Sequence, residues 1–102
     1  MDKPNVLSED EVKNGLGNLP GWSYSDNKIS KEFQFKDFVD SLSFVNSMVA
    51  YFETMDHHPD TFIMYSKIQF FLQRFDVGGK VTDRDLEVAK KIEENYASWK
   101  RQ

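Results

Sequence analysis

Two adjacent histidines, His57 and His58, are the side chains of this sequence best suited to moving protons. An imidazole has an ordinary pKa of about 6.5, so it both donates and accepts protons near neutral pH. The surrounding segment, residues 53–60, contains three carboxylates, those of Glu53, Asp56 and Asp60. Carboxylates can fix the tautomer and the orientation of a nearby imidazole. The segment therefore predicts a general acid–base site, with a polar loop of solvated histidines as the alternative.

Two other chemistries are open to a histidine pair, metal binding and nucleophilic catalysis. Zinc generally takes at least three protein ligands, and adjacent histidines in an extended loop tend to point apart. Asp56, Asp60 or Glu53 could complete a ligand set, but the sequence has no HExxH motif and no repeated ligand spacing. A serine triad needs a serine at a sharp glycine-framed turn, and no GxSxG motif is present. We favour acid–base catalysis, with Glu53 and Asp56 as candidate orienting groups.

The element that must carry the histidines is a helix that begins after Asp37, whose side chain can cap it. Apolar residues at steps of three or four define its stripe: Phe38, Leu42, Val45, Val49 and Phe52. Three further apolar residues widen this stripe: Phe44, Met48 and Met55. We therefore expect a well-buried helix. Because the residue before a proline avoids helical geometry, Pro59 places His58 beyond the helix end.

A short helix and a β-hairpin are predicted before this long helix. Ser8 and Glu11 have the spacing of a capping box, and the helix they begin should end at Pro20 and Gly21. Its apolar stripe consists of Val12, Leu16 and Leu19. A turn cluster at 25–27 then separates two stretches of alternating apolar residues, which predicts the hairpin.

Two strands and a final helix are predicted after the histidines. Residues 61–65 and 68–75 have strand composition, and Thr82 and Asp85 form a second box-like helix start. The apolar face of this last helix comprises Leu86, Ala89, Ile92, Tyr96 and Trp99. The order α-β-β-α-β-β-α, with hairpins in place of long crossovers, predicts an α+β fold. Its four-stranded antiparallel sheet would be covered by three helices on one face.

Length and composition narrow the range of functions. A chain of 102 residues is expected to form a single domain, residues 1–102. Its net charge of −4 provides no basic field for phosphate backbones, which argues against direct nucleic-acid binding. The chain has no cysteine, and we find neither a signal peptide nor an apolar run long enough for a bilayer. We expect a soluble, cytoplasmic protein without a membrane partner.

One ordered pattern links the histidines to a known family: Glu53-x3-His57-His58-Pro59-x5-Tyr65-x9-Phe75-x9-Asp85. It resembles the signature of the pterin-4a-carbinolamine dehydratases, known in animals also as dimerisation cofactors of a homeodomain transcription factor. Further segments resemble family landmarks and occur in family order, at 7–9, 21–22, 33–38, 56–59, 77–82 and 83–89. The resemblance extends over nearly the whole chain, which makes it far more specific than the His-His-Pro run alone.

The resemblance implies the predicted fold and an activity. The family removes water from 4a-hydroxytetrahydropterin and gives the quinonoid dihydropterin, a step of tetrahydrobiopterin recycling. The chain is thereby expected to be a 4a-hydroxytetrahydrobiopterin dehydratase, a hydro-lyase that uses no metal and no other cofactor. This elimination needs the 4a-hydroxyl to be protonated as it leaves and a proton to be taken from the pterin ring, which suits paired imidazoles.

The resemblance also implies roles for individual residues. His58 is expected to protonate the leaving hydroxyl, His57 to bind substrate and assist proton transfer, and Glu53 to support the pair. The two histidine roles could be exchanged, and both rings are expected to face one cavity sized for a fused bicyclic ring. The other expected pterin contacts are Asp56, Gln73, Arg74, Phe75 and Asp76.

The family commonly has a third histidine, or a tryptophan, where this chain differs. Counting from His57 places Phe75 at that position, whereas counting back from Asp85 without a gap places Asp76 there. A phenylalanine cannot move a proton, but its ring could stack on a planar pterin. If Phe75 occupies the position of the third histidine, catalysis would therefore depend on His57 and His58.

Partners follow from the family as well. Its members form homodimers or homotetramers, and a transcription-factor partner is implied by analogy only. The alternative function is thus a protein-interaction module that stabilises a partner's dimer, through an exposed strand edge or the face with Tyr96 and Trp99. Such a module need not keep His57 and His58, so their presence favours the enzyme.

Overall fold

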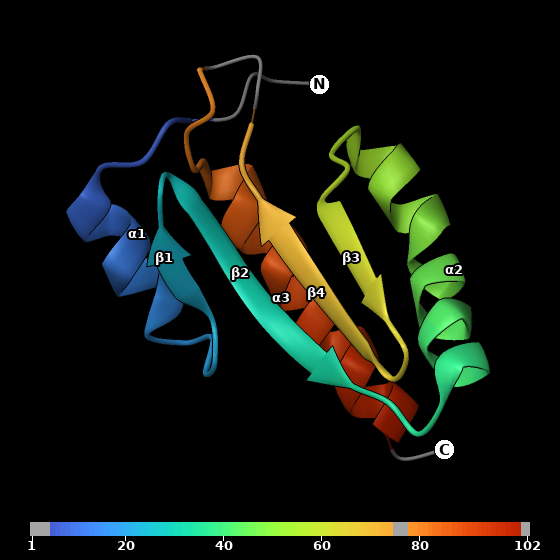
Figure 1. The fold of residues 1–102 in the computed structure, drawn as a ribbon. Helices are drawn as coiled ribbons and strands as arrows, with labels where there is room; N and C mark the ends of the chain where they lie inside the picture. The colour runs from blue at the N-terminus through green and yellow to red at the C-terminus, as the bar shows by residue number, and fades with distance from the viewer. Residues whose placement is uncertain (1–4, 75–77, 101–102) are drawn as a thin grey trace.

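The computed structural model describes residues 5–74 and 78–100, which form three helices and one four-stranded sheet (Figure 1). The elements are α1 (Glu9–Leu16), β1 (Ser23–Ser25), β2 (Lys28–Gln34), α2 (Phe38–Met55), β3 (Asp60–Met64), β4 (Lys67–Leu72) and α3 (Asp83–Lys100). The sheet is antiparallel throughout, in the order β1-β2-β4-β3, and the helices cover one face. The predicted fold class and element order are confirmed.

Local sequence signals set the ends of several elements. The Ser8 hydroxyl accepts from the Glu11 amide at 3.1 Å and the Glu11 carboxylate accepts from the Ser8 amide at 2.8 Å, so the predicted capping box is present. Asp37 caps α2 through the Asp40 amide at 2.8 Å. The hairpin turn places Asp26 and Asn27 at φ values of 53° and 62°, which matches the right-handed twist of the strands that it joins.

The buried face of α2 is only part of the predicted stripe. Its buried residues are Ser41, Phe44, Met48 and Phe52. Phe44, Met48 and Phe52 belong to the predicted stripe, but Phe38 and Val49, which also belong to it, are 45% and 47% exposed. Val39, outside the stripe, is 71% exposed. Apolar residues occupy more than one face of this helix, so periodicity alone could not select the face that packs on the sheet. The choice falls on the face carrying the large side chains Phe44, Met48 and Phe52, which fill the space between helix and sheet.

The core lies between the sheet and α3, which crosses behind it in Figure 1. The sheet contributes Ile29 and Phe33 from β2 and Ile68, Phe70 and Leu72 from β4, and α3 contributes Val88, Ala89 and Ile92. Tyr96 and Trp99 also pack against this core, and their polar atoms donate to the Gln34 carbonyl at 2.7 Å and to Asp40 at 3.0 Å. The apolar face of α3 is therefore used inside the molecule.

Exposed apolar side chains gather elsewhere, on β3 and on the turn after it. Phe62, Ile63, Met64 and Tyr65 are 57%, 46%, 36% and 74% exposed. We call these four residues the β3 strip. Because β3 is an edge strand, the strip lies beside unpaired backbone groups of the sheet. Within the described residues, no helix has the length and the apolar character needed to cross a membrane.

Replacing Phe33 by alanine is expected to destabilise the fold by about 3–5 kcal/mol. Its ring is 1% exposed and lies within 4.8–6.1 Å of the rings of Tyr96, Phe70 and Trp22, so truncation leaves a cavity at the centre of the core. Urea unfolding monitored by circular dichroism measures the change. Glu32→Ala, at the exposed neighbouring position of the same strand, is the control; equal losses in both variants would contradict the packing described here.

Candidate active site

The histidine pair lies directly after α2, where a left-handed turn ends the helix. Asp56 takes φ 49° and ψ 45°, and the amide of His57 donates back to the Phe52 carbonyl at 3.1 Å. A residue in this conformation commonly closes a helix, although glycine is the usual choice. The turn reverses the chain, so the two side chains leave in different directions. As predicted, His58 lies outside the helix.

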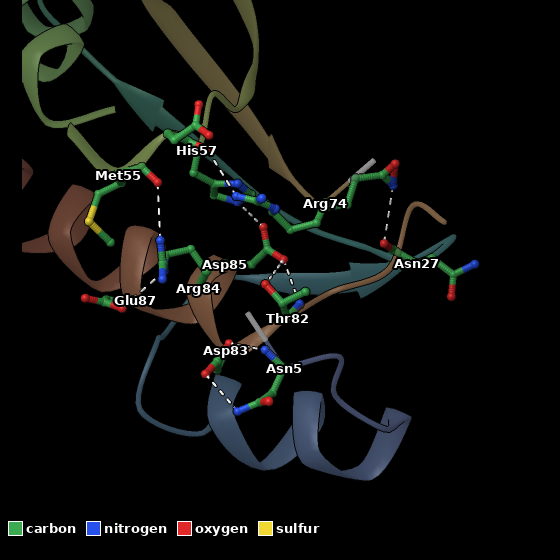
Figure 2. Close-up of polar contacts among 12 residues, drawn as sticks. Asn5, Asn27, Met55, His57, Arg74, Thr82, Asp83, Arg84, Asp85 and Glu87 are labelled. Carbon is green, nitrogen blue, oxygen red and sulfur yellow. Dashed lines mark hydrogen bonds and ion pairs between the residues drawn. The ribbon is translucent and has the colours of Figure 1, made fainter. Parts of the chain in front are cut away.

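His57 is buried against the start of α3. Its ring is 4% exposed, and its Nε2 atom forms a hydrogen bond with Oδ1 of Asp85, which is fully buried (Figure 2). The other oxygen, Oδ2, accepts from the Thr82 amide at 2.7 Å and from the Thr82 hydroxyl at 3.1 Å. A carboxylate taken out of water is costly unless its oxygens find donors. Here both oxygens of Asp85 are partnered.

This arrangement assigns a tautomer to His57. An ionised carboxylate only accepts hydrogen bonds, so a neutral ring must carry its proton on Nε2, facing Asp85. The lone pair then belongs to Nδ1. Nδ1 is therefore the atom through which His57 can accept a proton.

His58 has different surroundings. Its side chain is 57% exposed, and its Nε2 atom lies 2.6 Å from Oε2 of Glu53, which is 68% exposed. Glu53 was predicted, with Asp56, as a candidate orienting group for the two histidines. Because the turn at Asp56 directs His57 inward, Glu53 pairs with His58. The two rings thus have one buried carboxylate and one solvated carboxylate as partners.

Two arginines bind the carbonyl end of α2. Arg74 donates to the Asp56 carbonyl at 3.0 Å, and Arg84 donates to the Met55 carbonyl at 3.3 Å. Cations are favoured at this end of a helix because the last carbonyls are unpaired and the helix dipole is negative there. These contacts tie the turn that presents the histidines to the end of β4 and to α3, on either side of it.

The remaining predicted site residues lie at different places. Gln73 follows β4 and donates to the Asn27 carbonyl at 3.4 Å, at the β1–β2 turn, while the side chain of Asp56 is exposed. Phe75 and Asp76 lie outside the described residues, and with them the choice between these two as the third-histidine position. In the described ranges, no group of three histidine, aspartate or glutamate side chains is placed to hold a metal ion.

Asp85 and Thr82 are the residues of this cluster that sequence reasoning did not place in it. The sequence analysis identified Asp85 only as part of a helix start and as the last residue of the family pattern. The signal that could have identified it is the helix start itself, in which aspartate replaces the glutamate usual at the third helical position. The contact joins residues 28 apart, from the end of α2 to the start of α3, which only the packed fold brings together.

Comparison with known proteins gives one family throughout. The family model described as pterin 4 alpha carbinolamine dehydratase matches residues 5–95. A relative from Sulfolobus acidocaldarius, provisionally named a pterin-4-alpha-carbinolamine dehydratase, is 44% identical over 84% of this chain and 93% of its own length. A relative from Aquifex aeolicus with the same provisional name is 39% identical, over 86% of this chain and 88% of its own length.

Solved structures agree with this result. The crystal structure of a transcriptional coactivator/pterin dehydratase from Brucella melitensis superposes with a TM-score of 0.82 at 33% identity. It is matched over 89% of this chain and 98% of its own. A pterin dehydratase-like protein described as a RuBisCO assembly factor in the alpha-carboxysome has a TM-score of 0.58 at 15% identity, over 72% and 84% of the two chains. That second likeness concerns the fold alone.

Asp85→Asn is expected to move the proton of His57 from Nε2 to Nδ1. The fixed Thr82 amide donates toward this side chain, so the asparagine oxygen should turn to Thr82 and its NH₂ group toward His57. Nitrogen-15 NMR of the imidazoles measures which ring nitrogen is protonated. Glu53→Gln is the matched control, because it should alter only the His58 resonances. Unchanged His57 resonances in Asp85→Asn would contradict the assigned tautomer.

Proposed function

The chain belongs to the pterin 4 alpha carbinolamine dehydratase family, and we propose that it dehydrates a 4a-hydroxytetrahydropterin to the quinonoid dihydropterin by histidine acid–base catalysis. Residues 1–102 would act as one such domain in tetrahydrobiopterin recycling. The observation that carries the proposal is the buried hydrogen bond between His57 and Asp85 beside the exposed pair of His58 and Glu53. Consecutive residues thus carry two imidazoles, one buried and one exposed to solvent.

The elimination of water requires two proton transfers and neither an oxidant nor a reductant. The bond between C4a and the hydroxyl oxygen breaks, and the oxygen takes up a proton and leaves as water. The adjacent ring nitrogen loses its proton, and its electron pair forms the new double bond to C4a. One group must therefore give a proton and another must accept one, so two imidazoles in opposite protonation states fit the balance.

His57 is the candidate base in this scheme. Its Nδ1 lone pair accepts the proton from the pterin nitrogen, and the imidazolium that forms lies against the Asp85 carboxylate. A carboxylate in this position holds the tautomer of a histidine and stabilises its charged form, as the aspartate of a serine-protease triad does.

His58 is the candidate acid. Its exposed ring lies beside the Glu53 carboxylate, and solvent can return the proton after each turnover. The pterin itself would be held by the residues that the family resemblance implies: Asp56, Gln73, Arg74, Phe75 and Asp76. The difference in exposure between the two rings therefore favours His58 as acid and His57 as substrate-binding base.

Replacing either histidine by glutamine is expected to lower the accelerated dehydration by about 10²–10⁴-fold. Glutamine at position 57 can still donate to Asp85, so the buried carboxylate keeps a partner while proton transfer is lost. The measurement is the dehydration rate of a 4a-carbinolamine with the non-enzymatic rate subtracted, alongside circular dichroism. Glu32→Gln, an exposed glutamate remote from the pair, is the control. Full activity in His57→Gln would refute the base assignment.

We further propose that the chain forms a homodimer or homotetramer through the β3 strip. β3 is the edge of the sheet, and a second β3 could pair with it and cover exposed apolar side chains. The outer residues Phe38, Val39 and Val49 of α2 add to the exposed apolar surface. The same surface favours the second candidate function, an interaction module that binds a different protein.

Phe62→Glu combined with Ile63→Lys is expected to convert the oligomer into monomers, because charges then replace the apolar side chains of the β3 strip. Light scattering after size exclusion measures the mass against the 12.0 kDa of one chain. Asn14→Lys, an exposed change on α1, should leave the mass unaltered. A wild-type protein that is already monomeric would contradict self-association and favour the interaction module.

A further inference from the structure

We propose that Thr82 is a positioning residue for His57, acting through Asp85. Its hydroxyl and its amide together hold the Asp85 carboxylate in the one orientation that presents Oδ1 to the Nε2 proton of His57. The proposal deepens the dehydratase function proposed above and rests on it for the kinetic result only. The ring geometry that it concerns can be measured without any substrate.

The hydroxyl of Thr82 is used in an unusual way for its place in the chain. Thr82 immediately precedes α3, where a threonine side chain normally accepts a hydrogen bond from an amide of the first helical turn. Here the Asp85 amide donates to the backbone carbonyl of Thr82 at 3.1 Å. The hydroxyl instead donates to Oδ2 of Asp85 at 3.1 Å. The side chain of Thr82 therefore serves the carboxylate rather than the helix end.

Burial makes this contact consequential. Thr82 and Asp85 are both fully buried and His57 is 4% exposed, so the groups that hold the carboxylate must come from the protein. Two donors on Oδ2 leave Oδ1 as the oxygen that faces the imidazole. With the amide as the only remaining donor, the carboxylate could rotate, and the Nε2-protonated form of His57 would lose part of its advantage.

The backbone around Thr82 is itself fixed by the segment before α1. The Leu7 amide donates to the Val81 carbonyl at 3.0 Å, and the Asp83 amide donates to the Asn5 carbonyl at 3.0 Å. The Asn5 amide donates in return to the Asp83 carboxylate at 2.9 Å (Figure 2). Residues 81 and 83 are thus anchored on either side of Thr82. This bracing keeps the Thr82 amide and hydroxyl aimed at Asp85.

The test compares Thr82→Val with Thr82→Ser. Valine has the shape of threonine without the hydroxyl, whereas serine keeps the hydroxyl and loses a methyl group. We expect Thr82→Val to shift the ring nitrogen resonances of His57 toward a mixture of tautomers and to lower kcat about tenfold with KM nearly unchanged. Thr82→Ser should retain the wild-type resonances and most of kcat. Loss of general stability alone would move neither the tautomer nor the ratio of kcat to KM in the folded protein.

Wild-type His57 resonances and wild-type kcat in Thr82→Val would overturn the proposal. If Thr82→Val does not fold, Thr82→Ala removes the same hydroxyl without placing a methyl group against the carboxylate, and the same two results decide. If the wild-type protein shows no dehydration, the proposed function fails, while the tautomer measurement still decides the role of Thr82. The two failures are therefore distinguishable.

Discussion

The buried hydrogen bond between His57 and Asp85 is the interaction on which the candidate site depends. An imidazole and a carboxylate are both polar, and neither is stable inside a protein without partners. The two groups form a hydrogen bond with each other, and the amide and hydroxyl of Thr82 donate to the second oxygen of the carboxylate. The bond also joins the end of α2 to the start of α3. The same contact therefore connects two helices and determines which nitrogen of His57 can take a proton.

The turn at Asp56 gives two neighbouring histidines different properties. By reversing the chain in a left-handed conformation, it sends His57 into the protein and leaves His58 in solvent. Arg74 and Arg84 hold the two carbonyls of this turn from neighbouring elements. A pair of identical side chains thereby acquires one partner that is buried and rigid and one that is solvated. An elimination by acid–base catalysis needs one group that accepts a proton and another that donates one, and the two histidines differ in this way.

Sequence patterns predicted the fold well where local signals act. The capping box at Ser8, the cap at Asp37 and the turn at 25–27 each depend on neighbours in the chain, and the elements follow them. The inward face of α2 was predicted only in part, because its apolar residues occupy several faces. The partner of His57 was missed because its carboxylate belongs to another helix. The sequence offered Glu53 and Asp56 as orienting groups, whereas the packed fold gives His57 the carboxylate of Asp85.

The protonation of His57 in the unmodified protein tests this account most directly. Nitrogen-15 NMR of the histidine side chains near neutral pH identifies the nitrogen that carries the proton in each ring. The hydrogen bond to Asp85 predicts that His57 is protonated at Nε2 and carries its lone pair on Nδ1. A ring protonated at Nδ1, with Nε2 bare toward Asp85, would contradict the account.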